Sequence, residues 1–131
     1  AFYMLQLQVK IFAGQDLIPL SLQKSFPNFI FAQAVKATDI ISSVDDKINI
    51  VGLLDRRKEA EFTISAGEII DGLRCGLKIY GAAEIGALRA RECSEMGMVG
   101  VGKIYEQLEK SFLFRIWQII FHGQHQLHPR L

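Results

Sequence analysis

The sequence predicts a single-domain α/β protein with an open, mostly parallel β-sheet and helices on both faces, a Rossmann-like three-layer arrangement. Strand-like and helix-like stretches alternate along the chain, which favours parallel strands joined by crossover helices. Residues 47–55 and 77–82 are continuous apolar runs, typical of strands that are covered on both faces. No internal repeat or linker interrupts the alternation, so we expect one domain.

Composition limits the functions open to the chain. It has 131 residues, of which 50% are hydrophobic and 22% charged, as expected for a globular domain. The net charge of +1 argues against a dedicated nucleic-acid-binding protein. No apolar stretch reaches the roughly 18 residues of a membrane span, and residues 1–12 lack the order of a signal peptide. We therefore expect a cytoplasmic protein with two reduced thiols, Cys75 and Cys93, and no cofactor.

The first third of the chain predicts two strands and two short helices. Residues 5–13 alternate apolar and polar side chains, the period of a strand, and Gly14 ends it. Residues 21–26 form a short helical turn before Pro27, and residues 28–35 form a second strand. Residues 37–46 predict a short helix that begins near Thr38 or Asp39.

The middle of the chain has clear helix boundaries. After the buried strand at 47–55, Ser65 and Glu68 have the spacing of a capping box, which would satisfy backbone donors at both ends of the first turn. Ile69, Ile70 and Leu73 form the inward stripe, and Gly76 supplies a left-handed end. Residues 77–82 then form another buried strand. We expect helices at residues 83–97, ended by a glycine, and at residues 103–112.

Three residues at predicted strand ends, Gly14, Asp55 and Gly81, would lie at one edge of a parallel sheet, where such sheets bind ligands. Gly81 would allow a sharp bend, and the small Ala82 and Ala83 would let an anion approach the first amides of the next helix. Alternatively, these small residues only let the helix pack on the strand.

The strand-end carboxylate and a glycine-rich stretch each allow two interpretations. Asp55 is a candidate base, metal ligand or orienting group, or else a solvated turn residue that pairs with the basic residues after it. The stretch GMVGVGKI matches seven of the eight positions of a phosphate-binding loop, but Ile104 lacks the hydroxyl that would bind magnesium. We favour a glycine-rich turn that joins two helices.

The last segment, residues 111–131, has an unusual composition. It is apolar at first and carries Arg and His but no acidic residue. His122, His125 and His128 are spaced by three, but Gly123 and Pro129 disfavour a stable helix, so we expect no metal site. We divide the chain into a core at 1–110 and a tail at 111–131, which packs on the core, binds a partner, or is not a native end.

Three ordered blocks within residues 48–109 carry a resemblance to a known family. They read VGLLD, YGAAEIGALRARE and GMVGVGKIYE. The second is similar to a strand–turn–helix signature, F-G-A-x-S-M-G-A-L-R-A-A-E, and the third to G-M-x-G-x-G-x-I-Y/F. On these blocks the chain resembles the TfuA-like family. The matching motif positions are Gly86, Glu92, Gly97, Gly100 and Gly102.

The resemblance implies a role in peptide backbone thioamidation beside a YcaO-type enzyme. The TfuA-like protein would release sulfide from a thiocarboxylated sulfur-carrier protein of the ThiS type. In that chemistry, amides after Gly81, Ala82 and Ala83 would hold an anion, and Asp55 or Glu84 would position water. Arg89 would pair with a carboxylate, and neither nucleic acid nor membrane would be a partner. A noncatalytic adaptor that docks the enzyme or the carrier is the alternative.

The chain departs from the family pattern at positions that bear on activity. Glu84 and Ile85 stand where the family often has Ser and Met, and Arg56 stands where it often has Gly. Residues 66–68 read AGE where the family often has His-Lys-Glu. A requirement for that Ser or His would make this copy inactive.

Overall fold

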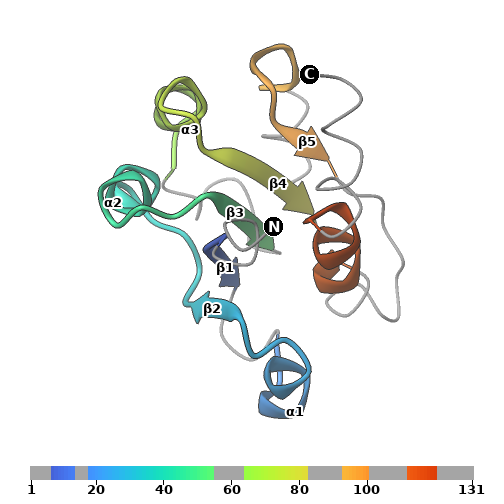
Figure 1. Ribbon diagram of the computed structural model, residues 1–131. Coiled ribbons are helices and arrows are strands. Elements are labelled where there is room, and N and C mark those ends of the chain that lie inside the picture. Colours follow the sequence, from blue (N-terminus) through green and yellow to red (C-terminus); the bar gives the residue numbers. More distant parts are fainter. Residues whose placement is uncertain (1–6, 14–17, 55–63, 83–92, 101–111, 121–131) are drawn as a thin grey trace.

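The computed structural model describes residues 7–13, 18–54, 64–82, 93–100 and 112–120, and the statements below concern these residues (Figure 1). They form a five-stranded sheet of order β2-β1-β3-β4-β5 in which every neighbouring pair is parallel. The predicted parallel α/β fold is therefore confirmed. The strands are β1 (Val9–Ala13), β2 (Phe29–Ala32), β3 (Ile50–Leu54), β4 (Lys78–Ala82) and β5 (Val99–Gly100).

The helices lie where the apolar spacing predicts them in the first two thirds of the chain. They are α1 (Leu20–Lys24), α2 (Asp39–Asp45) and α3 (Ala66–Arg74). Thr38 is the N-cap of α2, and Gly76 follows α3 with a φ of 94°, the left-handed end that its position predicts. None of the described helices is long and apolar enough to cross a membrane.

β3 is the centre of the sheet, and all five of its residues are buried. Its side chains alternate between the two faces, so Val51 and Leu53 belong to one core cluster while Ile50 and Leu54 belong to the other. A continuous apolar run thus marks a strand with both faces covered, as the sequence predicts.

Helices α2 and α3 cover one face of the sheet (Figure 1). Ile40 of α2 and Ile69 of α3 are fully buried against Val51 and Leu53. Gly72 allows the two helices to approach closely, because a Cβ at this position would lie only 2.5 Å from Cγ2 of Ile40.

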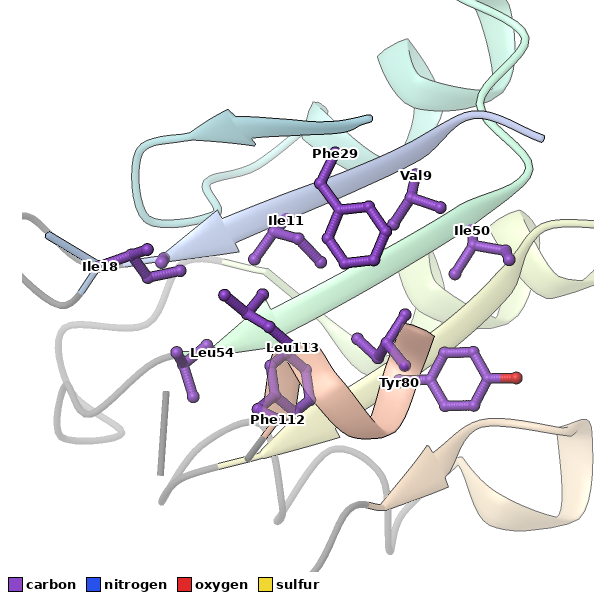
Figure 2. Packing of buried hydrophobic residues seen from close by; sticks show 11 residues of the cluster. Val9, Ile11, Ile18, Phe29, Ile50, Leu54, Tyr80, Phe112 and Leu113 are labelled. Carbon is purple, nitrogen blue, oxygen red and sulfur yellow. The ribbon is translucent and has the colours of Figure 1, made fainter. Parts of the chain in front are cut away.

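The helix at residues 112–120 covers the opposite face (Figure 1). Phe112, Leu113 and Ile116 are fully buried, and Figure 2 shows the first two near Leu54 of β3. Three interpretations of the tail at 111–131 were open: packing on the core, binding a partner, or a non-native end. Residues 112–120 pack on the core. The helix predicted at 103–112 shares only residue 112 with this helix. The rest of that prediction, residues 103–111, lies outside the described residues.

The glycine-rich stretch at 97–100 is not the turn between two helices that the sequence suggests. A 3₁₀ helix, η3 (Ser94–Met96), ends at Gly97, whose φ is 107°, and β5 follows at once. The expected end at Gly97 is therefore confirmed, but the helix does not run unbroken to it, because η3 begins only after Cys93, and the predicted turn between two helices is wrong. β4 offers an open edge here, and pairing of Val99 with Tyr80 and of Gly100 with Gly81 outweighs the weak strand propensity of glycine. A strand inside the stretch is also incompatible with a phosphate-binding loop.

Candidate functional site

The carboxyl ends of the strands define one edge of the sheet. Ala13, Leu54 and Ala82 end β1, β3 and β4 and are register partners across the three strands. The chain passes from β1 to β2 on one side and continues at β3 on the other, so the strand order reverses between β1 and β3. Ligands of open α/β sheets bind at the carboxyl edge beside such a reversal. We therefore place the candidate site there.

The register brings the two predicted centres of the site to this same edge. Leu54 immediately precedes Asp55, Ala82 immediately precedes Ala83, and Leu54 pairs with Ala82 in parallel strands. Leu54 and Ala82, the last described residues before these two segments, end at the same edge. Several predicted residues lie outside the described part of the chain: Gly14, Asp55, Ala83, Glu84, Gly86, Arg89, Glu92 and Gly102. Their roles stay predictions.

The described glycines and alanines of the predicted site are sheet residues. Gly81 and Ala82 lie within β4, opposite Leu53 and Leu54, so the chain leaves the sheet later than a bend at Gly81 would require. Gly81 is buried and pairs on its other side with Gly100 of β5. β3 and β4 therefore end together at Leu54 and Ala82, whereas β5 pairs only as far as Gly81.

A carboxylate in the first turn of α3 organises the neighbouring part of the edge. Oε1 of Glu68 accepts a hydrogen bond from the backbone N–H of Thr38 at 2.9 Å, and Oε2 accepts one from Ile40 at 3.1 Å. Glu68 thus caps the N-terminus of α2, where negative charge is stabilised by the helix dipole. The sequence analysis missed this contact because the two helices are about 30 residues apart.

The predicted capping box is half correct. Oγ of Ser65 accepts from the backbone N–H of Glu68 at 3.1 Å, as expected. The reciprocal half is wrong, because both carboxylate oxygens of Glu68 are directed at α2. Two amides at the start of α2 give a carboxylate more hydrogen bonds than the single N–H of Ser65 would.

The turn before α2 presents a positive charge near the same edge. Oδ2 of Asp39 accepts from the backbone N–H of Lys36 at 2.8 Å, and Oδ1 lies 3.0 Å from Nζ of Lys36. The Lys36 side chain is 74% exposed, so this ion pair is screened by solvent and leaves the ammonium accessible.

Among the described residues, Tyr80 in the middle of β4 and Cys75 after the end of α3 lie away from the edge, whereas Cys93 lies beside the start of α3. Burial raises the pKa of Tyr80, which keeps its phenol neutral, and Figure 2 shows the hydroxyl directed away from the apolar cluster. Cys93 is buried with Sγ 3.9 Å from the carbonyl oxygen of Ala66, and Cys75 follows the C-terminal end of α3. Neither thiol forms a disulfide.

A shallow hollow of about 240 Å³ lies at the amino edge, opposite the candidate site. At this edge Asn49 links the segments that precede β1 and β4. Its Oδ1 accepts a hydrogen bond from the backbone N–H of Gln8 at 2.8 Å, and its carbonyl oxygen accepts one from the backbone N–H of Lys78 at 3.0 Å. The hollow is lined by Val44, Lys47, Ile48, Asn49, Cys75, Gly76 and Leu77.

Comparison with known proteins supports the resemblance that the motifs suggest. A family model described as TfuA-like protein matches residues 58–115, which include α3, β4, β5 and the first residues of the helix at 112–120. No curated protein matches the chain. The chain is thus similar to TfuA-like proteins across α3, β4 and β5, whereas β1, β3 and Asp55 precede the matched residues.

Proposed function

We propose that this chain is a TfuA-like accessory protein of peptide backbone thioamidation. It releases sulfide from a thiocarboxylated sulfur-carrier protein of the ThiS type, and a YcaO-type enzyme uses that sulfide. The observation that carries the proposal is the match of residues 58–115 to TfuA-like proteins. The alignment of β3 and β4 supports it, because it directs the segments after Leu54 and Ala82 to one edge.

The reaction is the hydrolysis of a thiocarboxylate at the end of the carrier. Water adds to the carbonyl carbon, the carbon–sulfur bond breaks, and the products are a carboxylate and hydrogen sulfide. Catalysis requires a group that orients water and donors that stabilise the developing negative charge. In this proposal Asp55 or Glu84 orients the water, amides after Ala82 hold the anion, and Arg89 pairs with a carboxylate.

Sulfide release from purified, thiocarboxylated carrier tests the proposal directly. Wild-type protein should release sulfide with multiple turnovers, and Asp55→Asn should lower kcat roughly 100-fold if Asp55 orients the water. Asp71→Asn, at an exposed position of α3, is the matched control and should retain wild-type rates. An unchanged rate in Asp55→Asn removes Asp55 from the mechanism, and an inactive wild type contradicts the enzymatic role.

A noncatalytic adaptor is the second candidate, and the residues of α3 favour it. Ala66 begins α3 at a position where TfuA-like sequences often have His, and a methyl group cannot transfer a proton. In this case the chain docks the YcaO-type enzyme or the carrier without hydrolysing it. Co-elution with the carrier in the absence of sulfide release identifies the adaptor.

A further inference from the structure

The contact between Glu68 and the start of α2 has no role in the chemistry proposed above. It joins two helices that both begin on the carboxyl side of the sheet, and both oxygens of the carboxylate take part, at 2.9 and 3.1 Å. Thr38, in the Lys36–Asp39 turn after β2, and Ile40, in the first turn of α2, donate these bonds. The contact therefore fixes where this turn lies relative to α3.

The turn that Glu68 holds has an unfavourable backbone conformation. Thr38 has a φ of 73°, a left-handed value that is uncommon for a β-branched residue. Such conformations persist only where surrounding contacts enforce them, and they concentrate at functional sites. Here the enforcing contacts are the bond from the Thr38 N–H to Glu68 and the two bonds between Lys36 and Asp39.

The turn lies beside the candidate site. β2 ends at Ala32, which pairs with Phe12, the penultimate residue of β1. The segment after Ala32 therefore starts at the same edge as the ends of β1 and β3. Within this segment Lys36 presents its ammonium to solvent, and Asp39 fixes both its backbone and its side chain.

We propose that Glu68 is a positioning residue that holds the Lys36–Asp39 turn at the carboxyl edge, where Lys36 contacts the negatively charged end of the sulfur carrier. This role rests on the proposed function, because a thiocarboxylate tail is the anion that Lys36 meets. Glu68 acts through the turn and does not touch the reacting atoms. Its loss should weaken carrier recognition while the chemical step continues.

Glu68→Gln is the principal test, because it keeps the shape of the side chain but only one of its two acceptor atoms. The variant should raise KM for the carrier roughly three- to ten-fold and leave kcat within about two-fold. Hydrogen exchange should quicken at the backbone amide of Thr38 or of Ile40, whichever faces the NH₂ group of Gln and so loses its acceptor. Asp71→Asn, on an exposed face of the same helix, should change neither quantity.

Lys36→Met gives a second test that leaves Glu68 in place. It should raise KM by a similar factor and make KM less dependent on salt, because a screened charge contact has been removed. It also keeps the proposal testable if Glu68→Gln does not fold.

The outcomes separate this inference from the proposed function. Faster exchange in Glu68→Gln with unchanged KM and kcat would overturn the positioning role, as would an unchanged salt dependence in Lys36→Met. A wild-type protein that neither binds the carrier nor releases sulfide would overturn the proposed function and this role with it. In that case amide exchange still reports whether Glu68 holds the turn.

Discussion

The two faces of the sheet are covered in different ways. On one face, α2 and α3 pack on β3 and are joined to each other by close contact at Gly72 and by the hydrogen bonds of Glu68. On the other face, the helix at 112–120 lies over β1 and β3 through apolar side chains, among them Phe112 and Ile116. In the described part of the chain, the first face combines packing with the polar contacts of Glu68, and the second is packed by large apolar side chains.

This difference has a consequence for how each face tolerates change. Apolar burial is not directional, so the covering helix is held by the volume and placement of a few large side chains. In the α2–α3 pair, the side chain of Ile40 packs directly on Gly72 and leaves no room there for an added methyl group. Both faces should be sensitive to the removal of buried atoms, since Ile40, Ile69, Phe112 and Ile116 are all fully buried. Added atoms should damage the first face at Gly72 and the second at Gly52, where a Cβ would lie 2.7 Å from Cδ1 of Ile11.

Truncation of Phe112 should have the largest effect. Phe112 is fully buried, and Phe112→Ala should lower the free energy of unfolding by about 3–5 kcal/mol. Phe114 lies in the same helix but is 49% exposed, so Phe114→Ala should cost about 0.5 kcal/mol or less. Urea unfolding of the two variants measures the difference. Equal costs would mean that the helix at 112–120 does not cover the sheet in solution.

Addition of a methyl group at Gly72 should have the next largest effect. The new Cβ would meet Cγ2 of Ile40 at 2.5 Å, and overpacking of this kind costs about 1–3 kcal/mol, partly offset by the higher helix propensity of alanine. Gly67→Ala is the control in the same helix, because its Cβ would lie 3.7 Å from Oγ of Ser65. We expect thermal unfolding to show a lower Tm for Gly72→Ala and an unchanged or higher Tm for Gly67→Ala.

The smallest effect should come from Tyr80 and should depend on pH. Burial raises the pKa of Tyr80 above its ordinary value of 10.0, so the folded protein resists ionisation that the unfolded chain undergoes. This contribution to stability is fully present below pH about 10 and is lost as the pH rises through the pKa of the folded state. Tyr80→Phe should therefore lose less stability than wild type between pH about 9 and pH about 11. Identical alkaline profiles would contradict the burial of the phenol on this face.

The sequence by itself determined the local elements and the direction of the strands. Alternation in residues 5–13 and the unbroken apolar run before Asp55 identify β1 and β3, and the glycines at 76 and 97 end their helices with positive φ. These features depend on short-range spacing and backbone sterics, which can be read along the chain. The parallel register that carries the segments after Leu54 and Ala82 to one edge follows from the same alternation of strands and helices.

Only the tertiary structure decided which distant segments meet. It directed Glu68 to the start of α2 and not to Ser65, and it turned the glycine-rich stretch at 99–100 into an edge strand of the sheet. It also placed Phe112 and Ile116 on the face that α2 and α3 leave uncovered. Each of these outcomes depends on a partner far away in sequence. The partner is the pair of amides at the start of α2 for Glu68, the open edge of β4 for residues 99–100, and the apolar face of the sheet for Phe112 and Ile116. No local pattern carries that information, because such contacts form only when the chain is folded.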